Sequence, residues 1–412
     1  MVRSRCFYGY IIVAVCFLIN LAVAGMLGSF GVFFKPIMED MGWTRTVTSG
    51  AFSLFSIVGG VMGVIGGMLS DKLGPRIVLL LFGLASAAGY FLVSQMTSIW
   101  QFYLYYGCIA GLGSNVFVPT MSTVAKWFHK KRSLMSGISF SGSGLGMIIL
   151  PLFCNWMIKM YDWRISLIVV SGIIIAATVL AVLFLKADPS KIGQLPYGAT
   201  KIESGSTRAQ TSSISFREAT HSGVFWILVC CLFCFGLIFA AFQVHIAIHA
   251  IDLGISSDGA AGVLTVMGLG TIAGQVGLSN IGDRFGTKNA FIIGVAGFVI
   301  AVAILLFARQ LAWLLVFAVI AGLAFGDAST QESPIVAWLF GLGSHGTILG
   351  VCAFSWTLGG AIGPLLWGVI YDARGSYQYA FWMAGAASVL ALVLAVLLKK
   401  PAAGKNAVSK AN

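Results

Sequence analysis

The chain has 412 residues, of which 58% are apolar and only 9% carry a charged side chain. Soluble globular proteins have about 25% charged residues, so this composition excludes an ordinary soluble protein. The net charge of +12 comes from basic residues scattered between apolar runs, the longest basic run being Lys130, Lys131 and Arg132, which argues against a nucleic-acid partner and for a lipid bilayer.

Apolar runs of about 20 residues, long enough to cross ~30 Å of hydrocarbon, recur along the whole chain. They lack the period-two alternation of a membrane β-barrel, so we expect an all-α membrane protein. The sequence predicts twelve transmembrane helices, at 8–34, 46–68, 77–96, 100–126, 133–156, 164–186, 223–248, 258–281, 289–308, 311–338, 346–370 and 378–398.

One long hydrophilic stretch divides these spans into two sets of six. We predict an N-terminal half at 1–186, a central loop at 187–222, a C-terminal half at 223–398 and a tail at 399–412. Cytoplasmic loops of membrane proteins are enriched in Lys and Arg. With both termini in the cytoplasm, 19 of the 25 Lys and Arg residues lie on that side. We therefore predict cytoplasmic termini and a multi-pass protein of the plasma (inner) membrane.

The two halves share an eight-residue pattern after their second span. LSDKLGPR runs from Leu69 to Arg76, and IGDRFGTK runs from Ile281 to Lys288. Repeated six-span halves are typical of secondary transporters, which place the substrate between them. A carboxylate in such a loop can bind basic groups or a helix N-terminus and hold the cytoplasmic side closed; the alternative is a solvated loop charge. The pattern predicts cytoplasmic gating by Asp71, Arg76, Asp283 and Arg284.

GMLSDKLGPR, from Gly67 to Arg76, resembles the cytoplasmic loop signature of the major facilitator superfamily. The span count, central loop and repeat extend the resemblance over essentially the whole chain, and it implies alternating access by rocking of two helix bundles. Three segments resemble the monocarboxylate transporter family, including its bacterial oxalate/formate antiporter branch: GSFGVFFKPIMEDMGW (Gly28 to Trp43), KWFHKKRSLMSGISFSGSGLG (Lys126 to Gly146) and VHIAIHAIDLGIS (Val244 to Ser256).

The sequence departs from that family at three charged positions. Proton-coupled animal members carry a Lys in the first span, and an Asp followed four residues later by an Arg in the eighth; the Arg binds the substrate carboxylate. This chain has Gly28, Thr271 and Gln275 at those positions. The carboxylate-binding mechanism of those members therefore cannot simply be carried over.

Two carboxyls lie within the tenth span. An ionised carboxylate at the bilayer centre costs at least about 2.5–3.5 kcal/mol, so we expect Asp327 to face a cavity or a partner, or to be protonated. Glu332 is turned from Asp327 by roughly 140° around the helix, whereas Gln331 shares the face of Asp327. We predict that Asp327 and Glu332 belong to the substrate or proton pathway; hydrogen bonds between packed helices are the alternative.

Other polar residues of the spans are weaker candidates for the same pathway. His245 and His249 lie one turn apart in the seventh span and could carry protons or bond a neighbouring helix; a third metal ligand is missing, so we expect no metal. Thr271, Gln275 and Ser279 form a polar stripe in the eighth span, which either lines the cavity or joins helices. Their depth alone adds Asn115 and Trp356.

The sequence thus favours a secondary transporter without a cofactor. The first hypothesis is a small organic metabolite as substrate, a monocarboxylate or related carboxylate, coupled to a proton or a counter-solute. The alternative is a neutral or cationic solute, because two carboxyls but no Lys or Arg lie deep in the spans. A membrane enzyme or a channel is a third reading. Against an enzyme, the sequence has no phosphate-binding G-x-x-x-x-G-K-[ST] loop and no nucleophile elbow.

Overall fold

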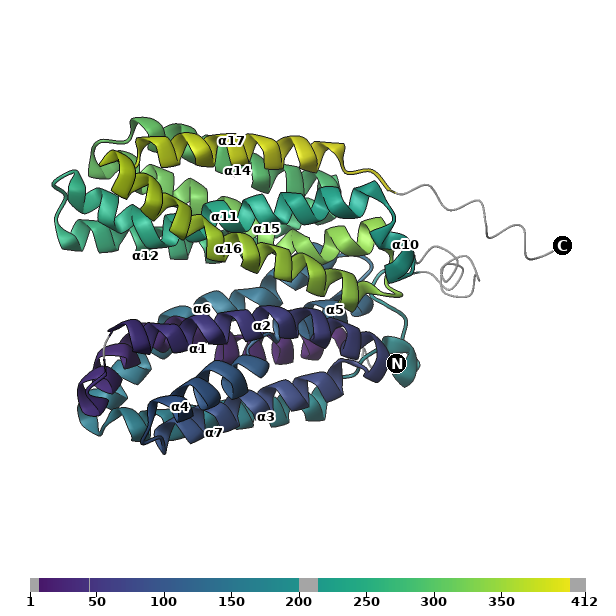
Figure 1. The fold of residues 1–412 in the computed structure, drawn as a ribbon. Coiled ribbons are helices and arrows are strands. Elements are labelled where there is room, and N and C mark those ends of the chain that lie inside the picture. Colours follow the sequence, from purple (N-terminus) through teal and green to yellow (C-terminus); the bar gives the residue numbers. More distant parts are fainter. Residues whose placement is uncertain (1–6, 44, 200–213, 401–412) are drawn as a thin grey trace.

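The computed structural model describes residues 7–43, 45–199 and 214–400 (Figure 1). The part it describes is helical, with a single isolated β-bridge between Phe128 and Tyr197. Residues 1–6, much of the predicted central loop and most of the predicted tail lie outside the described residues.

The N-terminal half of the chain forms long helices separated by short loops. In chain order the elements are α1 (Gly9–Met41), α2 (Arg45–Leu73), α3 (Pro75–Ser94), α4 (Ile99–Phe102), η1 (Tyr103–Ala110), α5 (Phe117–Trp127), α6 (Arg132–Met160) and α7 (Trp163–Phe184). Two short helices follow, η2 (Pro189–Ile192) and α10 (Phe216–Thr220).

The C-terminal half repeats this pattern of long helices. Its elements are α11 (Gly223–Asp252), α12 (Ser257–Ala273), the π-helix η3 (Gly274–Leu278), α13 (Ser279–Phe285), α14 (Thr287–Phe307), α15 (Leu311–Phe340), α16 (His345–Arg374) and α17 (Gln378–Leu397). Here α12, η3 and α13 continue one another as a single long rod.

Eleven helices of the described residues are long and apolar enough to cross a membrane. The predicted span at 100–126 is not among them, because it is divided into α4, η1 and α5 with a non-helical break at 113–116. Pro119 explains the break, since its ring clashes with the carbonyl four residues earlier in a continuous helix. The prediction of α-helical membrane spans is confirmed, but this span is not a single helix.

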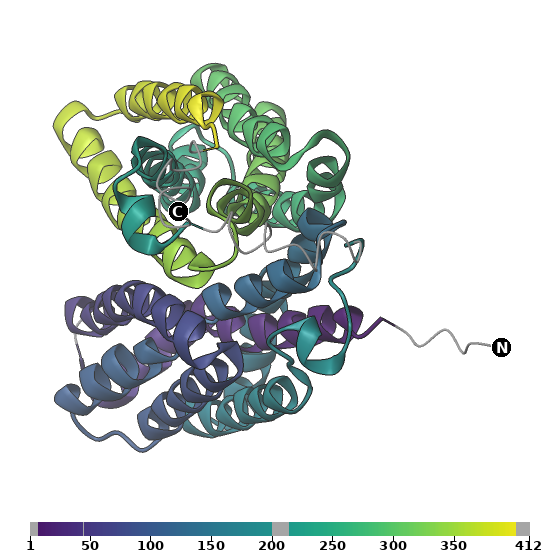
Figure 2. The same cartoon turned by 90° about the vertical axis from the view of Figure 1, so that its right-hand side faces the viewer.

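The helices form two groups that lie side by side (Figures 1 and 2). Helices α1 to α7 surround one apolar core, and α11 to α17 surround a second; a third apolar cluster joins residues of the C-terminal helices to Val118 and Met121 of α5. The groups meet where α2 packs on α16 and where α6 packs on η3, α13 and α15. Helix α1 begins and α17 ends at the same end of the molecule, which we call the termini end (Figure 1).

Candidate functional site

Asp71, near the end of α2, caps a helix of the other group. Its Oδ1 accepts a hydrogen bond from Gly346 N (3.0 Å), and its Oδ2 accepts bonds from Thr347 N (2.7 Å) and Thr347 Oγ1 (2.8 Å). Both residues lie in the first turn of α16, whose free N–H groups and positive dipole end favour an anion. Gly67 permits this approach, because a Cβ there would collide with the Gly346 carbonyl.

Asp283, near the end of α13, makes the matching contact in the opposite direction. Its Oδ1 accepts a bond from Ser133 N (3.1 Å), and its Oδ2 accepts one from Leu134 N (3.0 Å). Both donors lie in the first turn of α6. We call these two contacts the Asp71 cap and the Asp283 cap. The repeated aspartates thus each join the two groups of helices at the termini end.

The arginines of the repeated loops do not take part in the caps. Arg76 and Arg284 are exposed, and neither forms an ion pair with another described residue. Their assignment to the gate stays a prediction.

A row of polar side chains runs from the Asp283 cap into the interior. Ser133 Oγ donates to Gln331 Oε1 (2.9 Å), and Gln331 Nε2 donates to Asp327 Oδ1 (3.3 Å). Gln331 Nε2 also approaches the Ser279 carbonyl (3.5 Å). Together with Gln275 these four residues form what we call the polar seam, between α6 of one group and α13 and α15 of the other.

Asp327 is the carboxyl of the polar seam. Its side chain is 0% exposed, and its Oδ2 has no hydrogen-bond partner among the described residues. An unpaired charge in a buried site costs several kcal/mol. The arrangement therefore suits a carboxyl that takes up and releases a proton.

Gln275 lies in η3, a π-helix, a form often found at functional sites. It is 1% exposed, and its Oε1 has no partner among the described residues. Its carbonyl accepts from Ser279 Oγ (2.6 Å) and faces Gly137 of α6, where a Cβ would collide with it. Thr271, one turn earlier, bonds its own helix at the Met267 carbonyl (3.0 Å). Gln275 thus faces the other group of helices.

The remaining candidates lie apart from the polar seam. Glu332 is buried on α15 with Oε1 lacking a partner. Asn115 stands in the break before α5 and donates to the Gly59 carbonyl of α2 (3.4 Å). Trp356 of α16 is half-buried, with its ring centroid 6.3 Å from that of Phe325.

The two histidines of α11 pack within the C-terminal group. His245 bonds Tyr377 Oη through Nδ1 (3.0 Å) and the Pro364 carbonyl through Nε2 (2.9 Å). His249 packs edge-on against Phe381, with ring centroids 4.9 Å apart, and its Nε2 has no partner among the described residues. The structure therefore does not bring the histidines together with Asp327, and a role in proton transfer stays a prediction.

Two polar residues of the interior were not singled out in the sequence. Asn20 is 0% exposed and donates to the Cys16 carbonyl (2.8 Å), Thr120 Oγ1 (3.3 Å) and the Ser139 carbonyl (3.3 Å), which joins α1, α5 and α6. His345 starts α16 and bonds the Ser333 carbonyl (3.0 Å). A lone Asn in an apolar span is the signal that could have identified the first.

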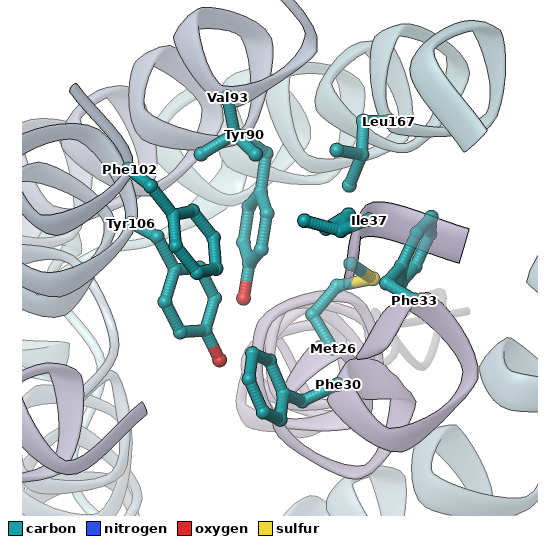
Figure 3. Close-up of a pocket in the computed structure, with 9 residues that line it drawn as sticks. All are labelled: Met26, Phe30, Phe33, Ile37, Tyr90, Val93, Phe102, Tyr106 and Leu167. Carbon is teal, nitrogen blue, oxygen red and sulfur yellow. The ribbon is translucent and has the colours of Figure 1, made fainter. Parts of the chain in front are cut away.

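A small pocket lies inside the N-terminal group, between α1, α3, α4, η1 and α7 (Figure 3). The hydroxyls of Tyr90 and Tyr106 point into it among apolar side chains (Figure 3). It offers about 10 Å³ for the centre of a water molecule, enough for about one water and too little for a metabolite. The described residues also hold no cluster of three His, Cys, Asp or Glu that could bind a metal ion.

Comparisons with known proteins agree with this architecture. The sequence model of the Major Facilitator Superfamily matches residues 15–279 and 246–412. Monocarboxylate transporter 13 of Rattus norvegicus is 27% identical over 395 residues, which cover 92% of this chain and 86% of that protein. Monocarboxylate transporter 11 of Homo sapiens is 25% identical over 397 residues, covering 92% of this chain and 80% of the relative.

Solved structures share the fold. The human organic anion transporter MFSD10 aligns with a TM-score of 0.75 at 18% identity, covering 94% of this chain and 99% of that structure. These relatives are membrane transporters rather than enzymes. Because the family match covers nearly the whole sequence, the chain belongs to the Major Facilitator Superfamily of membrane transporters.

Proposed function

We propose that this chain is a secondary active transporter that moves a small organic metabolite, a monocarboxylate or related carboxylate, across the plasma membrane by alternating access coupled to protons. The observation that carries the proposal is the pair of caps, Asp71 on α16 and Asp283 on α6. Both join the two helix groups at one end only, as a carrier requires to close one side of the membrane while the other is open.

The proposed topology has twelve spans with both termini in the cytoplasm. In this topology α4, η1 and α5 together make the fourth span, and 1–186 and 223–398 are the two rocking halves. The Lys and Arg distribution supports it, because the loops at the termini end carry most of the basic residues. The caps then close the cytoplasmic side.

The carboxylate substrate rests on similarity to monocarboxylate transporters and needs a binding mode without a buried cation. Among the described residues, the buried polar side chains include no Lys or Arg. A carboxylate left unpaired in a low-dielectric site costs several kcal/mol. The substrate therefore enters protonated, or it receives neutral hydrogen bonds from the Gln275 amide and its neighbours.

A neutral or cationic solute is the second candidate. It is favoured by the same absence of buried Lys and Arg, together with the buried carboxyl of Asp327. Such a substrate would need no compensating positive charge in the site.

Counterflow in proteoliposomes tests the proposal. Vesicles preloaded with unlabelled lactate or pyruvate should accumulate the labelled compound faster than empty vesicles, because only a carrier is stimulated from the opposite side. Neutral and cationic metabolites of similar size serve as the comparison. Stimulation by these alone would reject the carboxylate and leave a carrier of the second class; no stimulation by any tested metabolite would contradict the proposed carrier for these substrates.

Gln275→Arg separates the two candidates on one variant. An Arg supplies a paired, bidentate charge, so binding of simple monocarboxylates should tighten if they are the substrates. For a neutral or cationic substrate, the same charge should abolish transport. Gln275→Met, which keeps the bulk without the charge, shows how much either effect owes to size. If the Arg variant matches the Met variant for every substrate, Gln275 does not contact the substrate.

A further inference from the structure

The Gln331 amide lies between Asp327 and the Asp283 cap at the termini end. On α15 it lies one turn beyond Asp327 toward that end, and both side chains are 0% exposed. Its Nε2 donates to the Asp327 carboxyl (3.3 Å), and its Oε1 accepts from Ser133 Oγ (2.9 Å) of the other helix group. Each end of the amide is therefore held by a different group of helices.

The backbone at Gly282 of α13 closes the remaining side of this amide. A Cβ at Gly282 would lie 2.5 Å from Ser133 Oγ, 2.8 Å from Gln331 Oε1 and 2.9 Å from Gln331 Nε2. These distances are shorter than real Cβ contacts, so the amide fills the space between α6, α13 and α15. Since Ser133 N also donates to Asp283, separation of the groups at the Asp283 cap would remove Ser133 from Gln331.

Among the described residues, no charged side chain of the neighbouring helices forms an ion pair with Asp327, and several of them bond other partners. On α6, Arg132 Nε donates to the Phe128 carbonyl (2.9 Å), and on α14, Lys288 Nζ donates to the Val396 carbonyl (2.8 Å). On α16, His345 bonds the Ser333 carbonyl, and on α13, Asp283 caps α6. Glu332 on α15 points to a different side of the helix from Asp327. Gln331 is the polar partner that the described residues give to Asp327.

Among its described residues, the N-terminal half has no counterpart of this arrangement. At the second position of its capped helix α16 stands Gly346, where α6 has Ser133, and the Thr347 hydroxyl bonds Asp71 itself. Asn115 follows Asp71 by the same number of residues as Asp327 follows Asp283, so an uncharged amide stands where the C-terminal half has a carboxyl.

We infer that Gln331 is a gating residue that seals the Asp327 carboxyl from water at the termini end, and that Ser133 holds Gln331 in the sealing position. The inference rests on the proposed proton coupling through Asp327. While the Asp283 cap is closed, a proton on Asp327 cannot pass to water at the termini end. When the halves separate there, Gln331 loses Ser133, water reaches the carboxyl, and the proton leaves. The seal thus prevents protons from crossing without substrate.

Proton influx into proteoliposomes without substrate tests the inference, with a trapped pH-sensitive dye and an imposed pH gradient. Gln331→Ala empties the sealed space and should raise influx at least severalfold over wild type. Gln331→Met keeps the volume and should not leak. Ser133→Ala should leak less than Gln331→Ala, because the amide remains but loses its anchor. Thr178→Val removes a buried hydroxyl that bonds only its own helix, at the Ile174 carbonyl of α7 (2.7 Å), and is the matched control, expected not to leak.

The double variant Gln331→Ala with Asp327→Asn identifies the route. The leak should disappear if protons pass through the Asp327 carboxyl, whereas a general loss of packing would leave it unchanged. If Gln331→Ala keeps its folded size-exclusion profile and shows no more proton influx than wild type, the inference is overturned. A leak that persists in the double variant with Asp327→Asn would overturn it as well. Wild-type substrate uptake that does not change with pH would instead reject the proposed proton coupling. Proton influx measured without substrate would still test the seal at Gln331.

Discussion

The two halves make the same contact at the termini end but differ in what lies behind it. The Asp71 cap uses two main-chain N–H groups of α16 and the Thr347 hydroxyl, and all three donate to the Asp71 carboxylate itself. The Asp283 cap uses two main-chain donors of α6, and the Ser133 hydroxyl turns inward to Gln331. The cap is therefore duplicated, whereas the connection from a cap to a buried carboxyl occurs once among the described residues.

The helices behind the caps differ in the same sense. Behind the Asp283 cap, α15 is continuous over 30 residues and carries Asp327. Behind the Asp71 cap, the corresponding segment breaks at 113–116 and carries Asn115. The repeat thus supplies two caps of similar geometry, and we propose that proton chemistry belongs to the C-terminal half.

The largest effect is expected at the close contact beside the polar seam. A Cβ at Gly137 would collide with the Gln275 carbonyl, so Gly137→Ala should prevent the halves from closing at the termini end. Overpacking costs about 1–3 kcal/mol, which shifts an equilibrium about 5- to 150-fold. We expect transport to be nearly lost. Ser279→Cys, introduced in a background without native cysteines, reports on closure because Ser279 is buried. When it is combined with Gly137→Ala, this cysteine should react with impermeant maleimide added from the termini side.

Gly277→Ala is the matched control for Gly137→Ala. Gly277 lies in η3 like Gln275, but a Cβ there would meet no atom within 4 Å. It should transport and label like wild type. If Gly137→Ala behaves like Gly277→Ala, the close contact does not limit closure.

The carboxyl of Asp327 should determine the pH dependence of transport. We expect uptake to quicken as the outside pH falls, because a protonated carboxyl can cross between the two states without carrying net charge. Asp327→Asn should flatten this dependence. Glu332→Gln is the matched comparison, since it neutralises a buried carboxyl of the same helix outside the polar seam. If Glu332→Gln flattens the pH dependence of uptake and Asp327→Asn does not, Glu332 rather than Asp327 carries the coupled proton.

Neutralising the caps should have a moderate effect that differs between the halves. Asp71→Asn and Asp283→Asn each replace charge-assisted hydrogen bonds, which contribute about 1.5–3 kcal/mol each, by neutral ones. Initial uptake rates should fall in both while expression is kept. The fall should be larger for Asp71→Asn, which affects three bonds rather than two.

Asp162→Asn controls for the loss of a helix cap as such. Asp162 accepts from Ile165 N (2.9 Å) at the start of α7, within one half. It should transport normally. Equal and normal rates for the two cap variants would mean that the repeated loops are only connectors.

The two capping aspartates could be identified from the sequence, because they stand at the same place in a repeated pattern. Asp71 and Asp283 stand at equivalent places, and a carboxylate at a loop that faces helix starts has a defined chemistry. Their partners could not be predicted in the same way. Ser133 and Asp283 are separated by 150 residues, and only the packing of one half on the other brings them together.

The helices were predicted correctly where the length of an apolar run decides the structure. The break within the predicted span at 100–126 was missed, because it depends on local backbone contacts. The prediction of 311–338 closely matches α15, Leu311–Phe340, because a long apolar run suffices to define a span. The break at 113–116 depends on Pro119 and on Gly113, where a Cβ would collide with the Phe82 carbonyl of α3. Hydrophobicity carries no information on either contact.

The smallest effect is expected at the far end of the C-terminal half, at His245. Both of its ring nitrogens are bonded, one to Tyr377 Oη and one to the Pro364 carbonyl, and these bonds join α11 to α16 and to the start of α17. The N-terminal half has a comparable tie in Arg164, which bonds Asp40 (3.1 Å) and the Ser94 carbonyl (3.0 Å).

His245→Phe should therefore lower thermal stability and leave the pH dependence of uptake unchanged. The loss of two hydrogen bonds, to Tyr377 Oη and to the Pro364 carbonyl, should lower the free energy of unfolding by about 1–3 kcal/mol. Arg164→Met, which removes the tie of the other half, should act in the same way. Thermal unfolding of the purified variants and uptake across a pH series measure the two quantities separately. A flattened pH profile in His245→Phe, with unchanged stability, would show that His245 carries protons and that the C-terminal half has a second proton group outside the polar seam.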